Sequence, residues 1–240
     1  MMLRLPILIA LALALGAPEP ALALTGEITH VSGALIARRA DGQSRILSVK
    51  SSVHEGDVLA TADNAYARIR WGDGGEVIMR PNSQLRIDAY AYDEGRPQAD
   101  NILLSLIKGG MRSVTGLLAR RNPASFRLAT PTATVGIRGT NFGALFCNND
   151  CASIPTPAGG VPANGLHVDV SDGAIVVFNP AGSVEFRIGQ FGFVASLADP
   201  PVLVPPGQAV RVFLPATVLN QLIQGGTVGK QSELECSIDQ

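Results

Sequence analysis

The sequence is poor in charged and aromatic side chains, which make up 16% and 5% of its 240 residues. Proteins that bind nucleic acid need a dense basic cluster with aromatic partners, and this chain offers only two isolated arginine pairs, so we expect no nucleic-acid partner. Its charge is unevenly spread. Residues 24–145 hold 15 Lys and Arg against 11 Asp and Glu, whereas residues 146–240 hold 3 against 8. The basic and acidic halves are compatible with two parts of one fold that attract each other.

A recognisable catalytic or metal-binding set is also missing. The three histidines, His30, His54 and His167, are scattered, and no metal site is expected from such a pattern. No Gly-x-Ser-x-Gly nucleophile elbow occurs. His54 lies next to Glu55 and close to Asp57, which could imitate an acid–base pair, but we expect these side chains to be solvated turn residues. The sequence therefore predicts a protein that is not an enzyme and holds no cofactor.

Long apolar runs are absent after the N-terminus, so we expect no membrane span in the mature chain. The first 23 residues have the features of a signal peptide: Arg4, then an apolar stretch over residues 5–15, then small residues at Ala21 and Ala23. A membrane anchor is the alternative, but prolines interrupt the apolar stretch early. We predict cleavage near Ala23 and a periplasmic or secreted protein.

Cysteine is scarce, with three residues in the chain. Cys147 and Cys151 are close together, and in an oxidising compartment they are expected to form a disulfide that pins a short loop. Cys236 is then left free. Pairing of Cys236 with one of the other two cysteines is the alternative.

Glycine and proline are abundant, with 26 and 16 residues, which favours turns over long helices. Short alternating runs recur between these turns at spacings near ten residues. This pattern predicts an all-β fold, a compact stack of short strands that is β-helix-like or a sandwich. A short C-terminal helix is expected over residues 216–224, before two glycines. The expected strands are 27–31, 34–38, 46–49, 65–71, 76–79, 85–88, 102–107, 126–129, 134–146, 166–170, 174–178, 184–188, 191–195 and 210–214.

Several segments, taken in order, carry a family pattern. Residues 53–61 contain Gly-Asp-x-Leu-x-Thr, residues 77–83 end in a Pro-x-Ser turn, and residues 106–112 end in Gly-x-Met-Arg. The most specific run is Ala-Thr-Pro-Thr-Ala-Thr-Val-Gly-Ile-Arg-Gly-Thr-Asn-Phe at 129–142. Together these segments resemble the FecR domain of bacterial cell-surface signalling and of many exported proteins. The motif residues are Thr130, Pro131, Ala133, Gly136, Arg138, Gly139 and Thr140.

The resemblance implies a domain organisation. We expect a signal peptide (1–23), a FecR-like all-β domain (24–146) and a Pro/Gly-rich loop that holds the disulfide (147–165). Further strands packed on the same domain (166–214) and a short helix with a tail (215–240) complete the chain. The signalling regulators of the family carry a sigma-factor-binding segment and a membrane helix before the domain. A signal peptide stands in that place here, so direct control of a sigma factor is not implied.

Two groups of residues are candidates for binding. Arg138 could offer its guanidinium to a carboxylate of a ligand or partner. In the structural alternative, which we favour, Arg138 pairs with an internal acid, Gly139 adopts a conformation that side chains resist, and Thr140 restarts the strand. Trp71, Tyr90 and Tyr92 form a possible binding surface for sugars or a partner, although core packing is the favoured role for the two tyrosines.

The predicted function follows from the resemblance and the missing catalytic set. We expect an exported protein that binds other envelope proteins as a sensor, regulator or scaffold, for which an exposed strand edge is one route. A cell-wall or glycan-binding module, with peptidoglycan as the partner, is the alternative.

Overall fold

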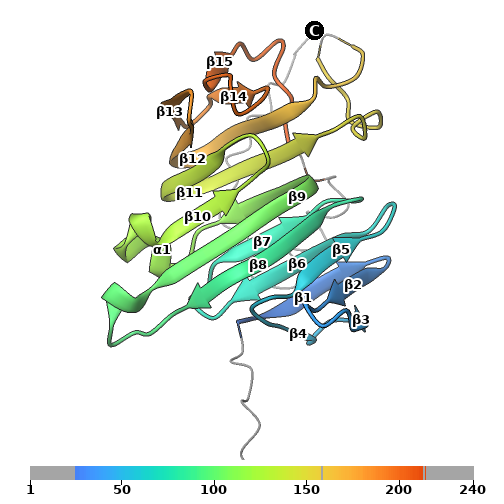
Figure 1. Ribbon diagram of the computed structural model, residues 1–240, viewed down its shortest axis with the longest axis vertical. Coiled ribbons are helices and arrows are strands. Elements are labelled where there is room, and N and C mark those ends of the chain that lie inside the picture. Colours follow the sequence, from blue (N-terminus) through green and yellow to red (C-terminus); the bar gives the residue numbers. More distant parts are fainter. Residues whose placement is uncertain (1–24, 158, 213, 215–240) are drawn as a thin grey trace, which may run out of the picture.

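A computed structural model of the protein describes residues 25–157, 159–212 and 214. The signal-peptide segment, the helix expected at 216–224 and Cys236 lie outside these residues. One 15-stranded sheet dominates the described part of the chain, which confirms the all-β fold class (Figure 1). The strands are β1 (Gly26–Ser32), β2 (Leu35–Arg38), β3 (Ser44–Leu47), β4 (Ser52–Val53), β5 (Val58–Thr61), β6 (Tyr66–Trp71), β7 (Glu76–Met79), β8 (Gln84–Ala91), β9 (Asn101–Val114), β10 (Phe126–Ala129), β11 (Thr134–Cys147), β12 (Gly165–Asn179), β13 (Gly182–Arg187), β14 (Phe191–Val194) and β15 (Val202–Val204).

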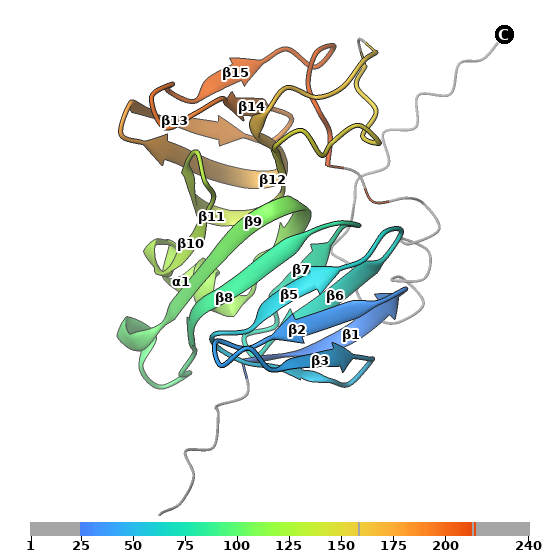
Figure 2. The same ribbon diagram turned by 45° about the vertical axis from the view of Figure 1, so that its right-hand side comes forward.

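The strands are stacked along the long axis of the molecule, with β1–β4 at one end and β13–β15 at the other (Figure 1). The long strand β9 joins the parts. Its first half pairs with β8 and, in parallel, with β10, and its second half pairs with β7 and β11. Figure 2 shows β2, β5 and β8 in front of β6 and β7. Apolar side chains from both sets belong to one buried cluster, for example Leu59, Leu85, Ile69 and Val77.

Alternation along the strands explains which side chains reach this core. In β2, Leu35 and Ala37 are buried while Ile36 and Arg38 are exposed. Successive side chains of a strand point to opposite faces of the sheet, so the period-2 pattern that predicted the strand also fixes its buried face.

The strand expected to stop before Gly109–Gly110 continues through both glycines to Val114. Gly109 has a φ of +74°, and a Cβ on it would lie 2.5 Å from Ser83 Oγ. The Ser83 hydroxyl accepts the Gly110 N–H at 2.8 Å and donates to the Gly110 carbonyl at 2.9 Å. Ser83, which is distant in the sequence, thus supplies hydrogen-bond partners for the backbone N–H and carbonyl of Gly110, so the strand does not end at the glycines.

The expected strand–turn–strand over residues 166–178 is also wrong, because β12 is one continuous strand. The register between β11 and β12 shifts between Arg138 and Phe142, so the turn-like Ser-Asp-Gly sequence is a β-bulge. Gly173 there has a φ of +72°. A bulge uses the same residue types as a turn but leaves the strand direction unchanged.

One expectation near the C-terminus is wrong. Residues 210–212 alternate like a strand but do not join the sheet. The short segment Val202–Val204, which has two prolines on each side, instead forms β15 on β14. The sequence also did not indicate the helix α1 (Leu117–Arg121). Its Leu118 N–H is accepted at 3.1 Å by the carboxylate of Asp73, which is far away in the sequence.

Candidate functional site

The first part of the family motif forms the turn between β10 and β11. The Thr130 hydroxyl donates to the Ala133 carbonyl at 2.7 Å and accepts the Ala133 N–H at 3.1 Å, with Pro131 in between. Because the threonine side chain closes the turn on both sides, these motif residues have a structural task.

The glycine and threonine that follow Arg138 form the bulge opposite Gly173. Gly139 has a φ of +58°, and a Cβ on Gly173 would lie 2.0 Å from the Gly139 carbonyl oxygen. Thr140 is buried, donates its N–H to Thr115 Oγ1 at 2.9 Å and accepts the Thr115 N–H at 3.0 Å. Gly139 and Thr140 thus lie in a bulge of the continuous strand β11, so Thr140 does not begin a new strand.

Arg138 itself points to the surface, and its side chain is 69% exposed. Its Nη1 lies 3.7 Å from Oε2 of Glu185 on β13, and Arg187 Nε donates to Oε1 of the same carboxylate at 2.9 Å. The acid that lies beside Arg138 is therefore a partly exposed residue of the same chain, at the edge of the sheet. Two guanidinium groups share one carboxylate, which leaves a local excess of one positive charge.

The register places Arg138 in a small surface of three strands. The side chains of this surface face away from the core, since the alternate residues on the same strands are buried, namely Val135, Ile137, Ile175 and Val177. We call this surface the motif face. Its three rows are Thr134–Phe178–Ser183, Gly136–Val176–Glu185 and Arg138–Ala174–Arg187.

The motif face has charged and apolar side chains next to each other, and it lies beside the edge strand β13. Phe178 is 39% exposed at one end, the arginines lie at the other, and Gly136 keeps the middle flat, since the nearest atom to a Cβ on it would be 3.9 Å away. Among the described residues, β13 pairs with β12 alone. Arginine and aromatic side chains are enriched in protein interfaces, and an unpaired strand edge offers backbone groups to another chain.

The predicted aromatic surface is arranged differently. Trp71 is 4% exposed and belongs to the core, where it stacks on Tyr90 with 5.8 Å between ring centroids. The Tyr90 hydroxyl accepts the Asp73 N–H at 2.9 Å, and burial, followed by the charge of Asp73, raises the pKa of Tyr90 above its usual range. Tyr92 is half-buried under the guanidinium of Arg121 at 4.9 Å. The three rings thus present no shared open platform on which a sugar could stack.

The expectation that His54, Glu55 and Asp57 are solvated is wrong for Asp57, which is fully buried. Its carboxylate accepts Arg45 Nη2 at 2.5 Å and the His54 N–H at 2.9 Å. A buried carboxylate needs such partners, and Arg45 lies on a different strand, which local reading of the turn did not reveal. In the described part of the chain, no group of three His, Cys, Asp or Glu side chains is placed to hold a metal ion.

The predicted disulfide between Cys147 and Cys151 is present, with Cα atoms 5.5 Å apart. It closes the short loop after β11, and both cysteines are buried beside Leu145 and Val210. Of the described segments, no helix has the length and apolar character to cross a membrane.

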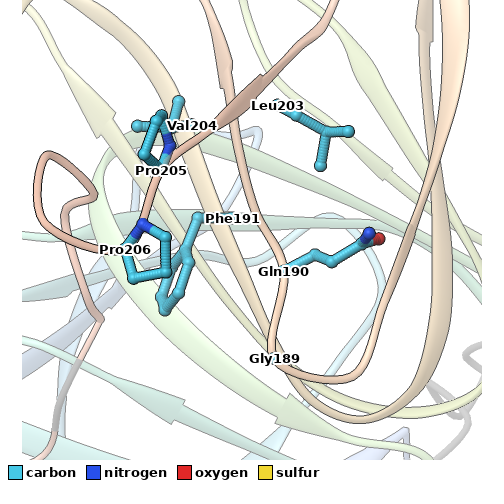
Figure 3. Close-up of a pocket in the computed structure, with 7 residues that line it drawn as sticks. All are labelled: Gly189, Gln190, Phe191, Leu203, Val204, Pro205 and Pro206. Carbon is cyan, nitrogen blue, oxygen red and sulfur yellow. The ribbon is translucent and has the colours of Figure 1, made fainter.

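Sequence reasoning missed a shallow apolar cavity between β14 and β15 (Figure 3). It has a volume of ≈ 370 Å³. The only sequence signal was the pair of prolines on each side of Val202–Val204, which marks a short extended segment. The cavity is lined by Gly189, Gln190, Phe191, Leu203, Val204, Pro205 and Pro206.

Comparison with known proteins gives a family for the chain. Residues 57–175 match the family model described as FecR protein. Two similar solved structures, at 2.50 and 1.65 Å resolution, show a candidate anti-sigma factor from Parabacteroides distasonis ATCC 8503. They are 15% and 14% identical to this chain, each with a TM-score of 0.45. Each match covers 61% of this chain and 58% of the other, so the chain spans less than two thirds of that protein.

No curated protein matches the chain. The family match begins after β4, includes β9, β10 and β11, and reaches the part of β12 that carries Ala174 and Ile175. It thus contains all seven motif residues and most of the strands that position them. On this basis the chain carries a domain of the FecR family.

Proposed function

We propose that the protein is a non-enzymatic regulatory or sensory module that binds a partner protein through the motif face. The observation that carries this proposal is the exposed guanidinium of Arg138, held by Glu185 beside the unpaired edge of β13. The FecR family, which is known from bacterial cell-surface signalling, supports a regulatory role over an enzymatic one.

The chemistry of the motif face suggests the kind of segment it binds. Arg138 and Arg187 share one carboxylate, so their remaining N–H donors suit a second carboxylate in a bidentate contact. Phe178 and Val176 offer apolar contact next to these charges, and β13 offers backbone donors and acceptors. An extended segment of a partner protein with an acidic and an apolar side chain matches all three features.

We further propose that the protein acts outside the cytoplasm, in the envelope or beyond it. The Cys147–Cys151 disulfide supports this location, because stable disulfides form in oxidising compartments. The signal-peptide features of residues 1–23 agree with it. The partner is then an envelope protein, and a signal to the cytoplasm would have to pass through that partner.

The test is an affinity capture with crosslinking from envelope fractions, with Arg138→Glu compared to wild type. Charge reversal places a second carboxylate beside Glu185 and repels an acidic partner, so we expect recovery of the partner to fall by at least about tenfold, the size expected of an interface hot spot. Arg96→Glu is the matched control, because Arg96 is exposed and pairs with Asp93 in the β8–β9 loop.

The control should recover the partner as wild type does. Equal recovery by wild type and Arg138→Glu, or equal loss with both variants, would overturn the assignment of the motif face. Recovery of no partner by wild type would count against a binding role of any kind.

A further inference from the structure

A second charged group lies buried on another part of the sheet. Arg112 on β9, Gly143 on β11 and Asp169 on β12 stand side by side in one row of the register. Arg112 and Asp169 are 8% and 6% exposed, and they pair at 2.5 Å across the glycine. Because Gly143 has no side chain, the ion pair passes directly over the strand backbone.

The Arg112 guanidinium is surrounded by acceptors. Its Nη1 donates to Asn141 Oδ1 at 2.9 Å and to Ser171 Oγ at 2.8 Å. Its Nη2 donates to Asp169 Oδ1 and, at 3.2 Å, to the Val212 carbonyl. The last acceptor belongs to neither of the strands that carry the pair.

Residues 209–212, which we call the strap, cross the sheet above this pair. Asp169 Oδ2 accepts the Val212 N–H at 2.9 Å, while Arg112 donates to the carbonyl of the same residue. The two charged side chains thus bind both backbone polar groups of one residue, Val212. In a β-strand, these backbone groups would pair with the backbone of a neighbouring strand. Here they pair with side chains instead, which explains why the alternating sequence of the strap forms no β-strand.

The strap alternates between buried and exposed side chains. Val210 and Val212 are buried with Leu145 and the disulfide, and Val212 is fully buried. Arg211 between them is exposed, and its guanidinium lies 5.1 Å from the ring centroid of Phe191. The sheet thus accommodates an extended apolar–basic–apolar segment.

Gly143 makes the room for this contact. A Cβ on it would lie 2.4 Å from Asp169 Oδ2 and 2.6 Å from Val212 Cβ. Close approach of another backbone is one reason for a glycine inside a strand. Gly136, on the same strand, has its nearest such neighbour 3.9 Å away, so the crowding is specific to the place where the strap crosses.

We propose that Arg112, Gly143 and Asp169 form the floor of a peptide-binding groove that the strap fills in cis. When the strap leaves, the groove takes an extended peptide of apolar–basic–apolar sequence in trans. The charged pair recognises main-chain atoms, which every peptide has, while the pockets of Val210 and Val212 select β-branched side chains. Phe191, whose ring lies beside the Arg211 guanidinium, also lines the cavity between β14 and β15. This inference does not depend on the motif face.

The first test measures release of the strap with trypsin, which cleaves after Arg211 when the strap detaches. In the full chain, Gly143→Ala should raise the rate of cleavage at this site at least about tenfold, since proteolysis follows the population of the open form. Gly136→Ala is the matched control and should leave the rate unchanged. Cleavage after Lys50, in an exposed turn between β3 and β4, serves as the internal reference.

The second test measures binding in trans by fluorescence anisotropy. The probe is a labelled peptide with the sequence of residues 205–214, and the proteins are full-length wild type, Val212→Asp, and Val212→Asp combined with Gly143→Ala. Val212→Asp places a carboxylate beside Asp169 in an apolar site and releases the strap while the floor stays intact. We expect Val212→Asp to bind the peptide at least about tenfold more tightly than wild type, because the groove is then vacant.

The double variant should lose this binding, because the alanine methyl group fills the groove. A peptide with aspartate at positions 210 and 212 should bind none of the proteins. Val212→Ser repeats the test with a milder change if Val212→Asp does not fold. Unchanged cleavage at Arg211 in Gly143→Ala would overturn the releasable strap, and failure of folded Val212→Asp or Val212→Ser to bind the peptide would overturn the groove.

Discussion

Single side chains that reach across the sheet hold several local features in place, and Asp73 shows this most clearly. Asp73 lies in the turn between β6 and β7, yet it is buried. Its carboxylate accepts the N–H of Gly75 at 3.1 Å and that of Leu118 at 3.1 Å, and its backbone N–H donates to Tyr90. One residue thereby ties a turn to helix α1 and to an aromatic pair.

We therefore expect Asp73→Ala to lower the free energy of unfolding by roughly 3 kcal/mol, because it leaves two buried N–H groups without acceptors. Urea unfolding followed by circular dichroism measures the change. Asp63→Ala, in an exposed turn, is the control and should stay within about 0.5 kcal/mol of wild type. Similar losses in both variants would refute the role assigned to Asp73.

The pH dependence of stability should carry a contribution from His167. Burial lowers the pKa of His167 below its ordinary value of 6.5, against the opposing effect of the Ala163 carbonyl. The unfolded chain therefore binds more protons than the folded one as the pH falls below about 7, so stability is lost in that direction. Thermal unfolding at pH 7.5 and pH 5.5 should show a smaller decrease in Tm for His167→Gln than for wild type. An equal decrease would contradict this assignment.

At the scale of elements, the bulge between β11 and β12 is fixed by glycines. Gly173→Ala should cost well over the roughly 1–2 kcal/mol of a left-handed alanine, because its Cβ would also collide with the Gly139 carbonyl. Gly189 has a similar φ of +79° but no atom within 4 Å of its Cβ position. Gly189→Ala should therefore show the conformational cost alone. Chemical denaturation of both variants separates the two costs, and equal values would show that the collision is relieved.

The disulfide should stabilise the loop after β11 and the strap that packs on it. In the chain-entropy account, so short a loop contributes about 2 kcal/mol. We expect a reducing agent to lower the Tm of wild type and to have no further effect on Cys147→Ser combined with Cys151→Ser. Cys236→Ser should respond to the reductant as wild type does. Loss of that response would favour a bond that involves Cys236.

For the whole molecule, the sequence predicted the features that repeat locally. Alternation located β1, β6, β7 and β10 and gave the all-β class, and the run at 129–142 gave the family. Features that depend on distant partners were not predictable. Ser83 forms hydrogen bonds with Gly110, so that β9 continues past its glycines. Arg45 pairs with the buried carboxylate of Asp57. Arg112 and Asp169 bind the backbone of Val212, so that residues 209–212 do not pair as a strand. Trp71 follows the exposed Arg70 on β6, but only the packing of Tyr90 shows that the tryptophan ring is covered.

The central claim is that the motif face binds a partner protein. Photo-crosslinking tests it most directly, with benzoylphenylalanine placed at position 178, where Phe178 is already an exposed aromatic residue. Position 46 is the control, because Ile46 is 82% exposed on β3 at the other end of the sheet. We expect a discrete crosslinked product from position 178 that disappears with Arg138→Glu, and none from position 46. Crosslinks that are equal at both positions, or that persist with Arg138→Glu, would contradict the claim.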